Sequence, residues 1–205
     1  MTDIKAVIFD FGGVLIDWNP YYLLRKVMVN DTDIENFLQE IDFKSWNYEC
    51  DKGLPFEASV EELCLKFPHR AELLRIYNER WLETLGRVFD RNVETLKALK
   101  DRGVPLYGLS NWSAEKFALV EPRYEFFSWF IDKAISGREK TAKPDPQLAR
   151  ILLERNHLDP KECVYIDDSE DNIRMGKNLG LNVILYQSSQ QLRTALADHG
   201  FLLPE

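Results

Sequence analysis

Hydrophobic residues along this chain occur in two patterns: short continuous runs and longer stretches with helical spacing. Short unbroken apolar runs are typical of strands that are buried on both faces of a parallel sheet. We predict such strands within 4–11, 104–109, 129–135, 163–166 and 182–186. Helical spacing predicts helices at 93–100, 114–120, 146–156 and 172–179. Because single helices between strands are typical of βαβ units, the chain is predicted to form an α/β fold with a Rossmann-like parallel sheet.

A long helical stretch interrupts this alternation near the start of the chain. Asn19-Pro20 is typical of a helix start. From there to about residue 88 the pattern predicts four short helices and no strand, with apolar stripes in 23–28, 34–41, 56–67 and 71–85. We expect a core domain formed by 1–17 and 89–205, with a small helical-bundle cap domain inserted at 18–88. The alternative is a single mixed domain with long helices.

The composition indicates a globular protein with a sizeable core. Hydrophobic residues make up 45% of the 205 residues, and aromatic residues 12%. With 34 acidic against 26 basic residues, the net charge of −8 gives no general electrostatic reason to bind nucleic acid or an anionic membrane. No apolar stretch approaches the ~20 residues of a membrane span, and the first apolar run is too short for a secretory signal. We expect a cytoplasmic protein that is a monomer or a weak homodimer.

Three of the predicted strands end in polar residues. Asp10, the pair Ser110-Asn111 and the pair Asp167-Asp168 stand at these positions. In an open parallel sheet, ligands bind beyond the carboxyl ends of the strands. Carboxylates that converge there repel one another unless a cation neutralises them, and Mg²⁺ suits a few carboxylates together with water and phosphate. The sequence therefore predicts a Mg²⁺ site. Lys143, just before a helix, is the further candidate charge.

Other common sites are not supported by the residue spacing. The three cysteines are far apart and lack a C-x-x-C pair, so neither a disulfide framework nor a zinc site is expected. The three histidines have no metal-ligand spacing, and no glycine-rich phosphate loop is present. An EF-hand at 167–178 fails because Asn172 stands where glycine is needed and Asn178 where glutamate is needed.

Four motifs resemble those of the haloacid dehalogenase-like hydrolases in order, spacing and position at strand ends. They are Asp10-Phe11-Gly12-Gly13-Val14, Leu109-Ser110-Asn111, Lys143-Pro144 and Asp167-Asp168-Ser169-Glu170-Asp171-Asn172. The resemblance covers nearly the whole chain. It implies that the predicted helical insert is the small cap that one subgroup of this family carries after its first motif.

The resemblance also implies a role for each motif. Asp10 would be the nucleophile that forms an aspartyl phosphate, and Lys143 would offset the charge of nucleophile and phosphate. Ser110 and Asn111 would bind the phosphoryl oxygens. The metal ligands would be the side chains of Asp10 and Asp168, the carbonyl of Gly12, and Asp167 either directly or through water. Asn172 and Asp171 would be supporting residues.

One position departs from the usual phosphatase pattern, in which the first motif has a second aspartate as general acid and base. Here that position is Gly12. The chain resembles bacterial α-D-glucose-1-phosphate phosphatases, which share this glycine and also have an aspartate like Asp17. The leading hypothesis is a Mg²⁺-dependent phosphatase of a small phosphorylated metabolite such as a sugar 1-phosphate. Asp17 is a further supporting residue, whose simpler role is to fix the turn into the predicted cap, although it could partly replace the missing carboxylate. The alternatives are a metal-independent 2-haloacid dehalogenase and a non-catalytic binding module.

Aromatic residues and one carboxylate offer weaker candidates for substrate selection. The aromatic residues could line a pocket between cap and core, or pack in the core; they are Trp46, Tyr48, Trp81, Trp112 and Trp129. Glu49 could bind a sugar hydroxyl.

Overall fold

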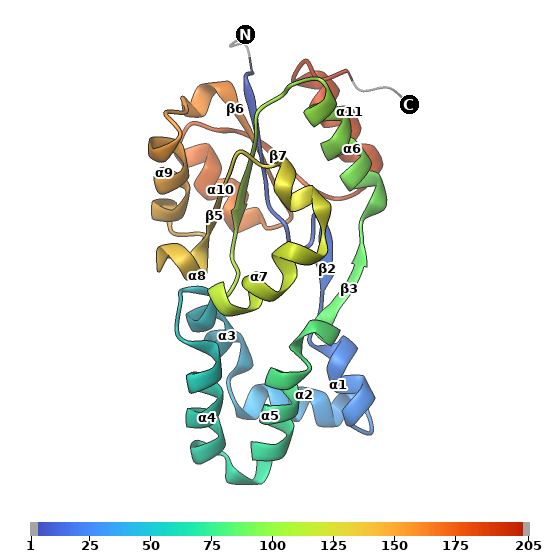
Figure 1. Ribbon diagram of the computed structural model, residues 1–205, viewed down its shortest axis with the longest axis vertical. Coiled ribbons are helices and arrows are strands. Elements are labelled where there is room, and N and C mark those ends of the chain that lie inside the picture. Colours follow the sequence, from blue (N-terminus) through green and yellow to red (C-terminus); the bar gives the residue numbers. More distant parts are fainter. Residues whose placement is uncertain (1–3, 203–205) are drawn as a thin grey trace.

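The computed structural model describes residues 4–202 and has a parallel sheet at its centre (Figure 1). The strand order is β5-β4-β1-β6-β7. The strand bounds are β1 Ala6–Phe9, β4 Leu106–Ser110, β5 Asp132–Ile135, β6 Cys163–Asp167 and β7 Asn182–Leu185. Each strand falls in a predicted segment or overlaps it, and the prediction of a parallel α/β core is confirmed.

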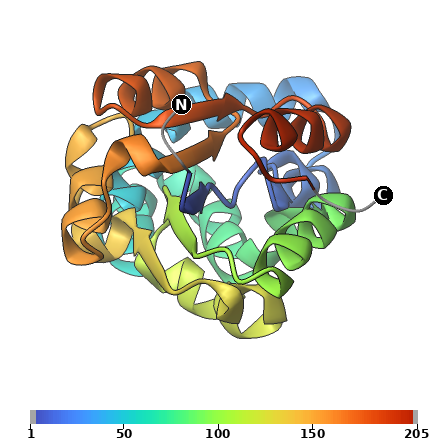
Figure 2. The ribbon, with the colours of Figure 1, turned by 90° about the horizontal axis from the view of Figure 1, so that it is seen from above.

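Helices cover both faces of this sheet, as Figure 2 shows from above. Val7 and Phe9 of β1 pack on the face covered by α6 and α11, while Ile8 points to the face covered by α9 and α10. This alternation explains why the strands are apolar throughout. The helix bounds are α6 Asp90–Asp101, α7 Ala114–Val120, α8 Ser136–Glu139, α9 Pro146–Arg155, α10 Glu170–Asn178 and α11 Ser189–Asp198. Short 3₁₀ turns span Pro68–Arg70, Trp81–Thr84, Glu121–Arg123, Glu125–Trp129 and Pro160–Glu162.

Five further helices gather at the end of the sheet opposite the chain termini (Figure 1). They are α1 Tyr21–Val27, α2 Asp31–Glu40, α3 Phe43–Asp51, α4 Phe56–Lys66 and α5 Ala71–Glu79. The stacked and edge-to-face rings of Phe43, Trp46, Phe56 and Tyr77 form an aromatic centre among α3, α4 and α5. This supports the predicted helical bundle, and the division at residues 18 and 88 stays a prediction.

Two features of this region differ from the sequence prediction. The expectation of no strand between residues 20 and 88 is wrong, because β3 (Leu85–Val88) pairs antiparallel with β2 (Ile16–Trp18). This two-stranded ribbon forms both connections between the sheet and α1–α5 (Figure 1). Its pairing joins residues far apart in sequence, so no local pattern reveals it. The helix α3 was also not predicted, since its few apolar residues are interrupted by polar ones.

The helices α1–α5 are tied to the core by side chains of the core. The Glu115 carboxylate accepts hydrogen bonds from the backbone N–H groups of Phe56 and Glu57, at 3.1 and 3.2 Å, and so caps α4. The Lys140 ammonium donates to the carbonyl of Gly53 at 2.9 Å. Within residues 4–202, no helix has the length and apolar character needed to span a membrane.

Candidate active site

The three central strands bring their carboxyl ends to one place. β1 lies between β4 and β6, and the chain order reverses there, which is where open α/β sheets bind ligands. Asp10 follows β1, Ser110 is the last residue of β4, and Asp167 is the last residue of β6. All three are buried. The structure thus brings together the polar strand ends that were predicted to meet.

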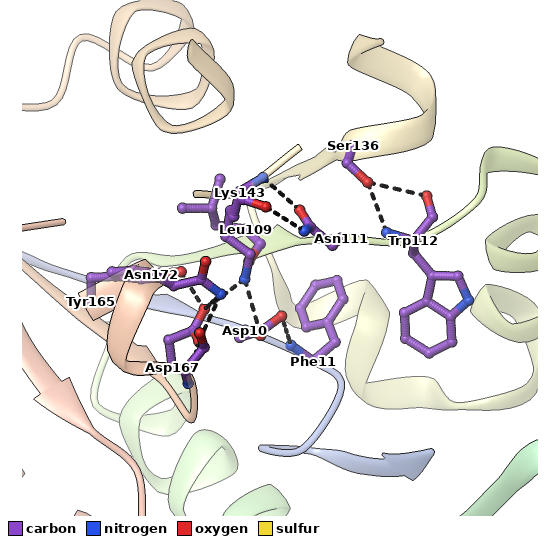
Figure 3. A network of polar contacts seen from close by, with 11 residues as sticks. Asp10, Phe11, Leu109, Asn111, Trp112, Ser136, Lys143, Tyr165, Asp167 and Asn172 are labelled. Carbon is purple, nitrogen blue, oxygen red and sulfur yellow. Dashed lines mark hydrogen bonds and ion pairs between the residues drawn. The ribbon is translucent and has the colours of Figure 1, made fainter. Parts of the chain in front are cut away.

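Lys143 is the buried cation of this group (Figure 3). Its Nζ lies 3.0 Å from Oδ2 of Asp10 and 2.6 Å from Oδ2 of Asp167. It also donates a hydrogen bond of 2.8 Å to the carbonyl of Leu109. Burial acts to lower the pKa of Lys143, but the two carboxylates outweigh it and hold this pKa above its usual value. The ammonium is therefore charged, with a partner for each of its three protons.

Asp167 is held by more donors than any other carboxylate of the group. Its oxygens accept hydrogen bonds from Lys143, the Tyr165 hydroxyl, the Ser169 backbone N–H at 2.8 Å and the Asn172 amide at 3.0 and 3.1 Å. Burial acts against ionisation, but Lys143 and these hydrogen bonds hold the pKa of Asp167 below its usual value. Asp167 is therefore an ionised carboxylate that fixes the position of Lys143.

The carboxylate charges of Asp10 and Asp168 are offset less fully by nearby donors and cations than the charge of Asp167. Burial raises the pKa of Asp10 to about 7 in spite of Lys143, and the charge of Asp167 adds to the increase. Burial and the charge of Asp167 also raise the pKa of Asp168, whose residue is the exposed member of the group. Oxygens of all three carboxylates lie within 4.8 Å of one another, which suits a single divalent cation.

Gly13 leaves the space that this arrangement needs. Its φ of +74° is in the left-handed region, and a Cβ atom at this position would lie 2.2 Å from Oδ2 of Asp168. Any larger residue would displace Asp168 from the cluster. The donor set, the excess of negative charge and this close approach all fit a Mg²⁺ ion held by oxygen ligands.

The loop after β4 joins the strand end to the Lys143 segment. The Asn111 amide donates to the carbonyl of Lys143 and accepts from its N–H, both at 2.8 Å (Figure 3). The Trp112 N–H donates to the Ser136 hydroxyl at 2.8 Å. The Ser110 hydroxyl hydrogen-bonds to Asp10, which acts to lower the pKa of that carboxyl. The side chain of Asn111 therefore orients the segment that carries Lys143.

A pocket of about 90 Å³ lies beside this group, between the core and the helices α1–α5. Three core residues line one side, and four residues from β2, α3 and the 3₁₀ turn after α5 line the other. They are Gly12, Asn111 and Trp112, and Trp18, Asn47, Asp51 and Trp81.

Two of the predicted supporting residues lie away from the group. Asp171 is exposed and forms an ion pair with Arg174 at 3.1 Å. Asp17 lies within β2 and accepts a hydrogen bond from the Tyr22 hydroxyl. Its contacts indicate that it stabilises the connection between the sheet and α1–α5.

Some of the weaker candidates for substrate selection lie at the pocket and the others lie away from it. Trp81 and Trp112 line the pocket, whereas the indole of Trp46 donates to Ser59 at 3.1 Å among α3–α5. Tyr48 lies beneath the Lys52 ammonium and Trp129 beneath that of Lys100. Glu49 is a surface residue whose carboxylate pairs with Lys52 at 3.1 Å.

Sequence reasoning missed Asp51, Asn47, Trp18 and Tyr165. Asn47 and Asp51 are four residues apart, so a helix over 43–51 would have placed both on one face. Because that helix was not predicted, the pair went unnoticed. The Tyr165 hydroxyl has no sequence signal, since it lies within an apolar strand.

The comparisons with known proteins agree with this geometry. A family model described as haloacid dehalogenase-like hydrolase matches residues 4–180. A phosphorylated carbohydrates phosphatase of Thermotoga maritima is 26% identical over 189 residues, covering 88% of this chain and 84% of the relative. A D-ribitol-5-phosphate phosphatase of Bacteroides thetaiotaomicron is 23% identical over 206 residues, covering 94% and 97%.

The solved structures show the same fold. A haloacid dehalogenase-like family enzyme of Bacteroides thetaiotaomicron superposes with a TM-score of 0.72 at 23% identity, covering 91% of this chain and 95% of that one. That enzyme has also been solved in complex with magnesium and inorganic phosphate. Since the family model spans most of the chain and the four motifs meet at one edge of the sheet, this protein is an enzyme of the haloacid dehalogenase-like hydrolase family.

Proposed function

We propose that the protein is a Mg²⁺-dependent phosphomonoester hydrolase that acts on a small phosphorylated metabolite through an aspartyl phosphate. The observation that supports this most is the Lys143 ammonium held between Asp10 and Asp167, with Asp168 open at the same edge. A carboxylate nucleophile and a phosphate dianion repel each other, and a fixed cation beside both offsets that repulsion. Two sequence relatives are phosphatases of phosphorylated carbohydrates or polyols.

The reaction has two displacements at phosphorus. In the first, an oxygen of Asp10 attacks phosphorus, the ester P–O bond breaks, and the alcohol leaves with a proton from solvent. In the second, water attacks the acyl phosphate, inorganic phosphate leaves with its proton released to solvent, and the Asp10 carboxylate is restored. Ser110 lies at the end of β4 beside Asp10, where its hydroxyl can bind a phosphoryl oxygen.

The metal would be held by the side chains of Asp10 and Asp168 and the carbonyl of Gly12. Bound there, it would supply positive charge to the phosphoryl oxygens. Asp167 is placed behind this site, because protein donors already occupy both of its oxygens. Asn172 supports Asp167 and acts on the metal site through it.

The missing carboxylate at position 12 favours substrates with good leaving groups. Without a residue to protonate the departing oxygen, hydrolysis should depend strongly on the acidity of the leaving group. An anomeric oxygen leaves more readily than an ordinary alkoxide, so we propose a sugar 1-phosphate over a sugar 6-phosphate. Residues 18–88 would act as a cap that admits small metabolites and excludes phosphoproteins.

Release of products from a panel of substrates tests this proposal. Phosphate release is measured from sugar phosphates and a phosphopeptide, with Mg²⁺ and again with excess chelator, beside halide release from 2-chloropropionate. We expect Mg²⁺-dependent phosphate release from the sugar phosphates alone. Halide release that persists in chelator would favour a dehalogenase instead. Binding of phosphate without release of either product would favour a non-catalytic module.

A further inference from the structure

The pocket beside Asp10 has unfilled space on its core side. Gly12 lines it, and a Cβ atom built on Gly12 would meet no atom within 4 Å. Asn111 and Trp112 line the same side, and both follow the strand end that carries Ser110. A phosphate on Asp10 would therefore direct the rest of the substrate toward this space.

The opposite side presents a carboxylate from outside the core. Asp51, the last residue of α3, accepts a hydrogen bond from the Asn47 amide at 3.0 Å. The backbone N–H of Ser113 is its second donor. Within residues 4–202, Asp51 has no ion pair, and the neighbouring Lys52 pairs with Glu49 instead. Asp51 can therefore accept a further hydrogen bond from a molecule in the pocket.

Two indole groups on the pocket wall lack partners. The Nε1–H groups of Trp18 and Trp112 are buried, and neither has a hydrogen-bond acceptor among residues 4–202. Trp112 as a residue is 5% exposed. Buried donors of this kind are normally paired, and an acceptor on a molecule bound in this pocket would give both indoles a partner. Trp81 completes the wall, with its ring centroid 6.2 Å from that of Trp112.

The chemistry of this lining indicates one class of occupant. We propose that the pocket binds a neutral, polyhydroxylated leaving group and that Asp51 determines this specificity by accepting a hydrogen bond from one of its hydroxyls. Hydroxyls can both donate to Asp51 and accept from the indoles, whose flat faces pack against the C–H groups of a polyol. The inference rests on the proposed function, since the leaving group is defined by phosphate transfer to Asp10.

The same lining disfavours a second anionic group. A carboxylate or second phosphate in the pocket would face Asp51, and none of the pocket-lining residues of the described chain is a lysine or arginine. Repulsion of the wrong substrate is a common source of specificity. The pocket is therefore expected to exclude carboxylated and doubly phosphorylated metabolites.

A matched pair of substrates isolates this effect. Glycerol 3-phosphate and 3-phosphoglycerate share a three-carbon skeleton, and a carboxylate in the second replaces a hydroxymethyl group in the first. At about pH 8.5 Asp51 is ionised, because burial raises its pKa only to about 7. There we expect the kcat/KM of the wild-type enzyme with Mg²⁺ to favour glycerol 3-phosphate by about tenfold or more, the usual effect of one charge-assisted hydrogen bond. Asp51→Asn should reduce this ratio by about tenfold, because the shape stays and the charge is lost.

Two further variants keep the experiment decisive. Glu49→Gln removes one negative charge from the exposed surface of the same helix and should leave the ratio unchanged. Asp51→Ser should also lower the ratio, and it replaces Asp51→Asn if that protein does not fold. A ratio unchanged by both Asp51 variants, or a wild-type preference for 3-phosphoglycerate, would overturn the inference and leave the phosphatase proposal standing. If the wild-type enzyme releases no phosphate from any ester, both fail.

Discussion

The two sides of the pocket differ in how completely their polar groups are paired. On the core side, each proton of the Lys143 ammonium has an acceptor, and both oxygens of Asp167 have donors. On the side of α1–α5, Asp51 has two donors, and the indole N–H of Trp18 has no acceptor in the described chain; the same is true of Trp112, which lines the core side. The network around Lys143 and Asp167 is therefore complete, whereas the groups that line the pocket are not all paired.

This difference separates two tasks. A group that must sit beside a reacting phosphorus has to be fixed before the substrate arrives, and a dense network of hydrogen bonds does this. Groups that select a leaving group have to keep hydrogen-bonding capacity for the ligand. The unpaired groups that line the pocket are therefore where we expect part of the substrate to bind.

The largest expected effect comes from removing the nucleophile on the core side. Asp10→Asn should lower kcat for phosphate release by at least about 10⁴-fold, because the neutral amide keeps the shape and loses the attacking oxygen. Steady-state assays with Mg²⁺ measure the loss, and a thermal melt shows that the variant is folded. A residual rate above a few per cent of wild type would remove Asp10 from the chemical step.

Breaking the core network should also have a large effect on stability. Lys143→Met leaves the buried carboxylates of Asp10 and Asp167 without their cation, and loss of one partner of a buried ion pair typically costs about 3–5 kcal/mol. Urea unfolding without metal measures this. The control is Lys97→Met, an exposed lysine paired with Asp101, which should cost under about 0.5 kcal/mol. Equal losses in both variants would mean that the network contributes little.

The sequence predicted the core side well because topology controls it. Asp10, Ser110 and Asp167 follow apolar runs, and the carboxyl ends of parallel strands lie at one edge of a sheet. Each residue could therefore be placed without knowing any side-chain contact. Lys143 lies in a loop, and its position was implied only by the motif that it shares with the family.

The other side could not be predicted because its parts depend on tertiary packing. Asp51 becomes a pocket residue only when α3 packs against the loop that contains Ser113. Glu49 was predicted as a sugar ligand and Asp51 was not. Residues two apart on a helix point in different directions, so the two carboxylates can be distinguished only once α3 is known. Trp18 reaches the pocket from β2, which pairs with the distant strand β3: Ile16 pairs with Val88, 72 positions later, and Trp18 with Leu85, 67 positions later.

Metal binding should stabilise the protein through the core side alone. At a Mg²⁺ concentration of about 100 times its Kd, the free energy of unfolding should rise by about 2.7 kcal/mol. Asp168→Asn should remove most of this gain, whereas Asp51→Asn should retain it. Thermal melts over a Mg²⁺ titration test both. Equal loss of the gain in the two variants would show that the metal site extends across the pocket.

A carboxylate at position 12 should change how the rate of hydrolysis depends on the leaving group. Gly12→Asp has space for its side chain and restores a proton donor, so the rate should rise about tenfold or more for poor leaving groups and least for aryl or anomeric phosphates. Gly12→Asn, similar in shape but unable to transfer a proton in this way, is the control. The measurement is kcat against leaving-group pKa. A uniform change across leaving groups would mean that position 12 does not set substrate preference.

The pH dependence of stability reports the incomplete pairing of Asp51 directly. Burial raises the pKa of this carboxyl to about 7, from an ordinary value near 3.8 that the unfolded chain should keep. The folded state therefore binds a proton that the unfolded state has lost over this interval, and stability must fall as the pH rises from about 4 to about 7. Asp51→Asn removes that dependence. The difference in free energy of unfolding, wild type minus Asp51→Asn, should decrease through this window and level off above it.

One titrating group gives this difference a slope of at most about 1.4 kcal/mol per pH unit, and partial solvent access makes it smaller. Urea unfolding at several pH values without metal measures the slope, and Glu49→Gln supplies the effect of removing an exposed charge from the same helix. A flat difference would mean that Asp51 is as well compensated as Asp167, and the contrast between the two sides of the pocket would disappear. A falling difference would mean that the protein gives up stability at the position where a substrate hydroxyl is expected to bind.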